Sequence, residues 1–347
     1  MHRCLAVLSL AACGGHSTDL GDGVSGIGLA CNQPTKLLAA AASIPRLAAA
    51  ASGSHLAVGW TADDATLGSA RISLDGADQV AAVERDAYAM AGNWTGVSLA
   101  MTPSATLVAL GRQDGHTMLV VNGGAPIDTT VQILAPGAAV ATGGTPAFAV
   151  AGDDSTTGMA AMLGVGEDGA LTGPVAIGSI AARLVATRIK DGLGASEVLS
   201  SNTCQLVPVD AAITRAGTPI GFGAKTKCTQ AAAVFIDDAT GTLLPFHDDG
   251  GAVMTATLKP DRTLGTAGAV GMPGTEPRAA ATSAGTWVSY GDSGMLEAAL
   301  VDATGKPGTR VMLGALGDAT SQTVVTAGDT AYALWLDGAL EIARLCP

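Results

Sequence analysis

Cationic and aromatic residues are both scarce in this 347-residue chain. It has 18 Lys and Arg against 30 Asp and Glu, a net charge of -12, and aromatic residues make up only 3% of it. An acidic chain with few aromatic side chains is poorly suited to binding nucleic acid or adsorbing to anionic lipid. Lys and Glu are few, whereas Gly and Thr are abundant, which argues against a helical protein.

Catalytic and metal-binding motifs are also missing. The chain has no G-x-S-x-G elbow, no Walker loop, no H-E-x-x-H motif and no C-x-x-C pair. The segment from Asp153 to Gly158 begins like a calcium loop, but Gly164 stands where a bidentate Glu belongs. We therefore predict no catalytic residue, no metal site and no cofactor.

The first residues have the pattern of an export signal. A short basic start precedes an apolar stretch, Cys4 to Ala12, which is shorter than the ~20 residues that cross a bilayer. The sequence Leu-Ala-Ala-Cys that ends at Cys13 resembles the bacterial lipobox. The resemblance implies that residues 1–12 are a signal peptide and that Cys13 carries a lipid. Ordinary secretion with cleavage nearby, or a chance match, is the alternative.

A lipid on this cysteine implies the bacterial cell envelope. Gly14 follows it, in place of the Asp that tends to retain enterobacterial lipoproteins at the inner membrane, so we expect the outer membrane. Residues 13–30 are the expected tether, because their Gly, Ser, Asp and Thr content favours flexibility. Residues 31–347 are the expected folded domain, which we predict to be a monomer.

The rest of the chain repeats with a period of roughly 46 residues. The segment beginning at Pro45-Arg46 aligns, with one gap, with the segment beginning at Pro277-Arg278. Each unit reads as a small-residue strand A, an alternating strand B, an Asp-rich turn, a strand C, a Gly turn and a short strand D. Asn-Gly and Asp-Gly between alternating strands are strong hairpin signals. The predicted C–D turns lie at Asp75-Gly76, Asn122-Gly123, Asp168-Gly169, Gly217, Asp261 and Gly305.

This repeat resembles the blade of a β-propeller, which has four short strands at a similar period. The A strands are Ala runs of four or five residues bounded by Gly, Ser and Pro, so strands are favoured over the helices that Ala otherwise prefers. We predict an all-β, seven-bladed propeller with four-stranded antiparallel blades. Motifs of named propeller families are absent, so no activity is implied. The B strands are predicted to begin near Leu56, Thr106, Ala147, Glu197, Leu243, Trp287 and Tyr332.

The seventh unit is one strand short, because its C–D turn would fall beyond Pro347. The segment Gln33–Leu38, about one period before the first D strand, is expected to supply that strand and close the ring. Four cysteines remain after the signal and the lipid site, and in an oxidising compartment they are expected to pair, with free or metal-binding thiols as the alternative. Ring closure would place Cys31 beside Cys346, so we predict that these two pair. Cys204 is expected in the B–C turn of blade four and Cys228 in the connection that leaves this blade, and because both connections lie on one face of a propeller we predict the pair Cys204–Cys228.

Acidic residues recur in the B–C turns and would lie on one face. They could bind a cation or a basic partner. Asp is also favoured in tight turns because its side chain bonds its own backbone, and we favour this interpretation. His247, beside two of these acids, is a candidate acid–base group, although a solvated turn histidine is favoured. The acids are Asp63, Asp64, Asp114, Asp153, Asp154, Asp248, Asp249, Asp292 and Asp337.

The expected function is a non-catalytic binding or scaffold lipoprotein with an unknown protein or glycan partner and no nucleic acid. The tether is expected to leave from the face of the C–D turns, opposite the acidic B–C turns. The alternative is a hydrolase or lyase acting on envelope or extracellular polymers, for which His247 and several carboxylates would have to meet in one deep pocket. An inert spacer is a third hypothesis.

Overall fold

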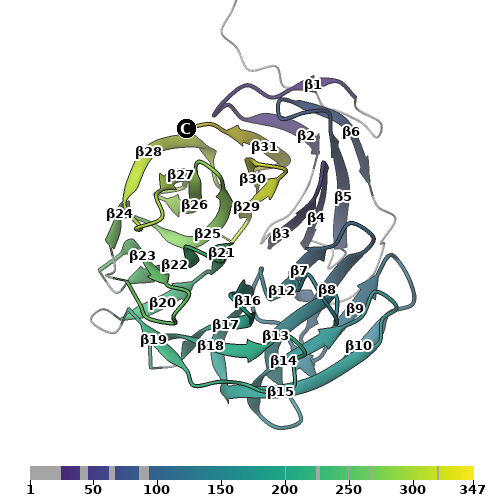
Figure 1. Cartoon of the computed structure of the whole chain (residues 1–347). Coiled ribbons are helices and arrows are strands. Elements are labelled where there is room, and N and C mark those ends of the chain that lie inside the picture. The colour runs from purple at the N-terminus through teal and green to yellow at the C-terminus, as the bar shows by residue number, and fades with distance from the viewer. Residues whose placement is uncertain are drawn as a thin grey trace, which may run out of the picture.

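Seven antiparallel sheets surround a central axis in the computed structural model (Figure 1). Each sheet is one blade with four principal strands, so the chain is a seven-bladed β-propeller, as the repeats predict. None of the described residues belongs to a helix long and apolar enough to cross a membrane. The structure describes residues 25–39, 46–61, 67–85, 94–199, 201–223, 227–248, 250–265, 268–318 and 320–347.

The first four blades use strands that follow one another along the chain. The strands of blades one and two are β3 (Leu47–Ser52), β4 (His55–Thr61), β5 (Leu67–Leu74), β6 (Gln79–Arg85), β7 (Trp94–Met101), β8 (Thr106–Arg112), β9 (Thr117–Val121) and β10 (Ile127–Thr129). Those of blades three and four are β11 (Val131–Gln132), β12 (Ala139–Ala141), β13 (Phe148–Asp154), β14 (Met159–Val165), β15 (Leu171–Ser179), β16 (Ala181–Ile189), β17 (Gly192–Leu199), β18 (Cys204–Asp210) and β19 (Ile220–Phe222).

The last three blades continue the pattern, and the N-terminal segment adds two strands. Blades five and six contain β20 (Cys228–Ala231), β21 (Val234–Asp237), β22 (Gly241–Asp248), β23 (Ala252–Leu258), β24 (Gly268–Pro273), β25 (Thr275–Thr282), β26 (Gly285–Asp292), β27 (Met295–Val301) and β28 (Pro307–Ala315). Blade seven contains β29 (Gln322–Ala327), β30 (Thr330–Leu336), β31 (Ala339–Leu345) and β2 (Thr35–Ala39), while β1 (Ile27–Gly28) joins blade one.

The hydrophobic core lies between the blades rather than inside any one of them. The described residues form seven buried apolar clusters, and each cluster joins two neighbouring blades. Small A-strand residues converge on the axis, and the bulky B-strand side chains, such as Trp287 and Tyr332, fill the wider space further out. The pairing of Trp60 with Gly68 is one case of close fit, since a Cβ at Gly68 would lie 2.1 Å from the Trp60 ring.

Two strands of the inner region differ from the expectation. The B strand of blade four is β17, so Glu197 lies near its end, and the predicted start there was wrong. The hairpin turn before β17 is made by Asp191, which has a left-handed φ of 62°, followed by Gly192; this turn signal was missed. The A strand of blade five is broken into β20 and β21.

The ring is closed by the N-terminal segment, as predicted. Strand β2 pairs with β31 as the outer strand of blade seven, with Thr35 opposite Ile342. A disulfide joins Cys31 to Cys346, whose Cα atoms lie 5.5 Å apart across 315 residues of sequence. Strand β1, which was not predicted, adds a fifth strand to the outer edge of blade one. Figure 1 shows these strands bridging the first blade and the last. One short segment therefore holds both ends of the ring.

The second predicted disulfide, Cys204–Cys228, is also present. Cys204 is the first residue of β18 and Cys228 the first residue of β20, so the bond links blade four to blade five. The backbone N of Cys228 also donates to the carbonyl of Asn202 at 2.8 Å. This disulfide supports a single junction between neighbouring blades.

Removing the ring-closing disulfide should therefore cost more stability than removing the other one. In the loop-entropy account, a bond spanning 315 residues contributes ~5 kcal/mol, and one spanning 24 residues contributes ~3 kcal/mol. Urea unfolding of the Cys31→Ser/Cys346→Ser and Cys204→Ser/Cys228→Ser variants measures both losses. Equal losses, or a larger loss for the second pair, would contradict the ranking.

Candidate functional site

The antiparallel strand order gives the ring two distinct faces. The A–B and C–D turns lie on one side, called here the AB face, while the B–C turns and the D–A connections lie on the other, called the BC face. Both ends of the Cys31–Cys346 disulfide lie at the C–D end of blade seven, on the AB face. The acidic turns belong to the BC face, opposite this disulfide.

The described acids of the BC face are distributed over separate blades. Asp114 forms an ion pair with Arg112 in its own turn, and Asp337 is an exposed residue of the β30–β31 turn. Ser293 Oγ donates to Asp292 Oδ1 at 3.0 Å. Within the described ranges, no three His, Cys, Asp or Glu side chains are grouped so that they could hold a metal ion. Cys13, Asp63, Asp64 and Asp249 lie outside the described residues.

Asp154 and Asp248 are engaged by their own turns. Asp154 accepts hydrogen bonds from the Thr156 N at 3.1 Å and from the Thr157 hydroxyl at 2.9 Å. Burial opposes ionisation of this carboxyl, but hydrogen bonds, chiefly from threonine side chains, hold its pKa below the usual value. Asp248 Oδ1 accepts from the Ala252 N at 2.8 Å. These contacts are the local turn chemistry expected of Asp.

His247 is a half-buried residue of β22 whose Nδ1 lies 2.7 Å from the Thr229 hydroxyl. No described cluster brings it together with several carboxylates. The arrangement that would distinguish the hydrolase or lyase hypothesis is therefore not found in the part of the chain that the structure describes.

Glu197 is a buried carboxyl that the sequence did not mark as special. Gln205 Nε2 donates to its Oε2 at 2.6 Å, while its buried Oε1 has no partner. Burial raises the pKa of Glu197 to about 7; the Gln205 hydrogen bond opposes this shift, and the nearby Asp153 adds to it. Glu197 and Asp153 lie at the junction of blades four and three. The Asp153 carboxylate there also accepts a hydrogen bond from the Ala181 N at 3.3 Å.

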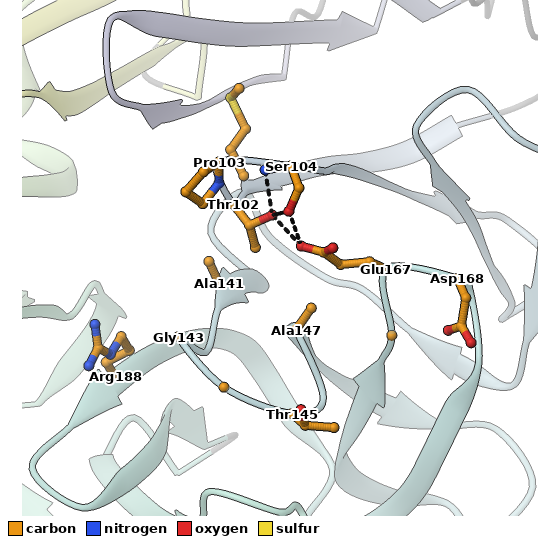
Figure 2. A pocket seen from close by; sticks show the side chains of 13 residues that line it. Thr102, Pro103, Ser104, Ala141, Gly143, Thr145, Ala147, Glu167, Asp168 and Arg188 are labelled. Atoms are coloured by element: carbon orange, nitrogen blue, oxygen red, sulfur yellow. Dashed lines mark hydrogen bonds between the residues drawn. The ribbon is translucent and has the colours of Figure 1, made fainter.

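A cavity of about 720 Å³ opens on the AB face and is called here the AB-face pocket (Figure 2). Four segments line it: the β7–β8 turn of blade two, the β12–β13 and β14–β15 turns of blade three, and the end of β16 in blade four. Met101 and Ala141 also line a second hollow, which lies between the A strands near the axis. The AB-face pocket therefore lies beside the axis. The lining residues are Met101–Ser104, Ala141, Gly143–Thr145, Ala147, Gly166–Asp168 and Arg188.

Glu167 connects blade three to blade two across the pocket. Its Oε1 accepts hydrogen bonds from the Thr102 hydroxyl at 2.7 Å and from the Ser104 hydroxyl at 2.6 Å. The Ser104 and Thr102 hydrogen bonds lower the pKa of Glu167, so it is a carboxylate at neutral pH. Asp168, next in sequence, instead accepts from the Ala170 N within its own turn. Figure 2 shows the Glu167 carboxylate turned toward the two hydroxyl groups.

Arg188 lies on the other side of the pocket from Glu167 (Figure 2). Its guanidinium carbon is 5.3 Å from the centre of the Phe235 ring, which is close enough for a cation–π interaction. This interaction restrains the Arg188 side chain. The Thr242 hydroxyl donates to the Arg188 carbonyl at 3.4 Å, which anchors its backbone to blade five. The pocket thus has a cation and an anion on opposite walls.

The chemistry of the pocket is amphipathic. Apolar groups of Met101, Pro103 and Ala147 form part of its surface, and hydroxyl groups, a carboxylate and a guanidinium supply acceptors and donors. Its volume is within the range of about 300–1,000 Å³ typical of small-molecule sites. Such a lining suits an uncharged ligand that has many hydroxyl groups and an apolar edge.

The sequence did not predict this pocket, because its residues come from three blades. Glu167 lies one residue before a C–D turn that was recognised only as a turn. Arg188 is the next-to-last residue of β16, the A strand of blade four, and no sequence pattern marked it. The only available signal was that the Thr-Pro-Ser turn after Met101 carries two hydroxyls, which is common in turns generally.

Comparisons with known proteins agree on the fold. No protein-family model matches the chain, and no curated protein matches its sequence. The BP39L lectin from Burkholderia pseudomallei is similar with a TM-score of 0.56 at 17% identity, covering 88% of this chain and 99% of the lectin. The SapL1 lectin, in complex with alpha methyl fucoside, gives 0.53 at 13% identity, covering 79% and 97%. The β-propeller domain of Cps50 (Swd1) from Myceliophteria thermophila gives 0.56 at 14%, covering 89% and 97%. The class that fold and likeness define is the β-propeller.

The buried carboxyl of Glu197 should make the protein less stable as the pH rises. The pKa of Glu197 in the folded protein is raised to about 7. The stability that its protonated form contributes is therefore fully present below the unfolded pKa of 4.5 and is lost as the pH rises through about 7. Glu197→Gln should therefore stabilise the protein at pH 8, by on the order of 3 kcal/mol, and change little at pH 4. Urea unfolding at both pH values measures this, with the exposed Glu84→Gln as control. The same difference from wild type at pH 4 and pH 8 would refute the assignment.

Proposed function

We propose that this chain is an envelope-anchored bacterial lipoprotein that binds a glycan, without catalysis, in the AB-face pocket. The observation that carries the proposal is the fixed Glu167 carboxylate facing Arg188 across a cavity whose other lining residues, apart from Asp168, are apolar or carry hydroxyl groups. A sugar offers hydroxyl groups to both walls and a C–H face to Met101 and Pro103. Hydrogen bonds between hydroxyls and charged groups are about 1.5–3 kcal/mol each, enough to orient a sugar ring.

Pre-organisation supports this ligand class. The two hydroxyls of blade two hold Glu167 in place before any ligand arrives, and Phe235 does the same for Arg188. Little side-chain entropy is then lost when a ligand binds. Two propellers of similar shape are described as lectins, one of them in complex with alpha methyl fucoside, which shows that this fold can support glycan binding.

Anchoring at Cys13 fits the position of the pocket. The described chain begins at residue 25 and reaches the ring at β1 and Cys31, on the AB face. A lipid on Cys13 would make the AB face the side of the ring nearer the membrane, and this is also the side on which the AB-face pocket opens. The acidic BC face would then point away from the membrane. A glycan at or near the membrane surface is the ligand that this arrangement suits best.

Loss of either charged wall should weaken glycan binding. An array of neutral monosaccharide and oligosaccharide glycosides, probed with the full-length lipoprotein in detergent, should identify a ligand whose affinity falls about ten- to hundredfold in Glu167→Gln and Arg188→Ala. Asp337→Asn, an exposed change on the BC face, is the matched control and should bind normally. Absence of binding to every glycoside, or an equal loss in the control, would contradict the proposal.

Lipidation is tested separately at Cys13. Cells producing the chain in the presence of an alkyne-tagged fatty acid should label the wild type, and the protein should fractionate with membranes. Cys13→Ser should carry no label and appear in the soluble fraction, whereas Cys4→Ser, inside the expected signal peptide, should still be labelled. A labelled Cys13→Ser protein would exclude this residue as the lipid site.

A further inference from the structure

Three arginines gather at the axis on the BC face, the side opposite the AB-face pocket. Arg46 directly precedes β3 in blade one, Arg183 is the third residue of β16 in blade four, and Arg278 is the fourth residue of β25 in blade six. Arg46 and Arg278 are the residues that the repeat alignment matches, each directly after a proline. Counted from the A–B turns, however, Arg278 is in register with Ala48, and Arg46 lies two residues further toward the BC face.

The carboxylates around these arginines do not balance their charge. Arg183 forms a bidentate ion pair with Glu276, and Arg278 Nη2 lies 3.2 Å from the same carboxylate. Asp318 is the other carboxylate that acts on Arg46. Among the residues that the structure describes, three cations therefore face two anions, which leaves one positive charge in excess. Burial lowers the pKa of Arg46, and the neighbouring Arg183 lowers it further, while Glu276 and Asp318 oppose both.

Arg278 has a free donor inside this cluster. Its side chain is only 8% exposed, and its buried Nε has no hydrogen-bond partner. Its Nη1 donates to the Pro277 carbonyl at 3.0 Å, and its Nη2 is taken by Glu276. A buried guanidinium N–H without an acceptor costs free energy, typically about 1–3 kcal/mol or more for a charged group. A ligand that accepts from Nε would remove this cost.

Arg278 also lines a cavity on the axis. This axial cavity has a volume of about 140 Å³, and the A-strand regions of all seven blades contribute to it. Apart from Arg278 and Thr323, its lining consists of Ala, Val, Leu, Pro and Gly. The volume corresponds to about four or five water molecules, or to one small organic ion.

We propose that the axial cavity binds a small monocarboxylate, whose carboxylate accepts from Arg278 Nε and whose short apolar tail lies among the Ala and Val side chains. One excess positive charge matches one carboxylate. A phosphate would bring more negative charge than the cluster leaves unbalanced and would have no group suited to the apolar wall. Guanidinium groups pair well with carboxylates, and in a site screened from water the interaction is stronger than at the surface. The proposal does not depend on the AB-face pocket.

Titration calorimetry of the full-length protein with sodium propionate, at constant ionic strength, tests this site. We expect one saturable site per chain. Arg278→Lys keeps the charge but removes the Nε donor, and it should bind at least tenfold more weakly. Arg46→Gln removes one of the three described cations, and with it the excess positive charge, so it should also bind at least tenfold more weakly. Its folding is not at risk from lost hydrogen bonds, because the Arg46 guanidinium donates to no described residue.

Arg215→Gln, which removes an exposed arginine of the β18–β19 connection, is the matched control and should bind like wild type. The same titration with sodium phosphate checks the ligand class, and we expect no competition with propionate. The proposal is overturned by any of three results: no saturable propionate binding, unchanged binding in Arg46→Gln, or phosphate binding as tight as that of propionate.

Discussion

Closure of the ring is the constraint on which the rest of the structure depends. Because each buried apolar cluster lies between two blades, no blade has a complete core of its own. The cluster between blades seven and one contains Leu37, Trp60 and Tyr332, which come from distant parts of the chain. An open ring would expose all of it, together with the edge of β31. Strand β2, strand β1 and the Cys31–Cys346 disulfide all act at this junction, so closure rests on three connections rather than one.

The repeat made most of this fold predictable from sequence. Blade number, the C–D turns and both disulfides follow from turn chemistry and a period, which are local and repetitive signals. Errors arose where a unit departs from its neighbours. The turn at Asp191 was overlooked, so the B strand of blade four was placed too late. Strand β1 has only two residues, and its pairing with Val80 depends on where the closed ring brings the N-terminal segment.

The candidate sites were much less predictable, for a physical reason. Glu167, Thr102 and Arg188 have unremarkable local sequence, and they meet only because three blades pack side by side. Acids of the B–C turns were conspicuous in the sequence, yet Asp154 and Asp248 bond to their own turns. The axial arginines did leave a signal, since two repeats carry the same Pro-Arg pair. The pair indicates the repeat but not the site, because strand register sets the two arginines at different levels, with Arg278 opposite Ser289 and Arg46 two residues further toward the BC face.

Net charge and local charge lead to different conclusions about anionic ligands. The chain carries -12 overall, and that value governs encounters with large polyanions, which meet the whole surface. Beyond roughly 8 Å, physiological salt screens the exposed acids, so they have little influence on a small ion already at the axis. There the charged group that lines the cavity is Arg278, which is buried, so screening is weak. An acidic propeller can therefore repel nucleic acid and still stabilise a single small carboxylate at its centre.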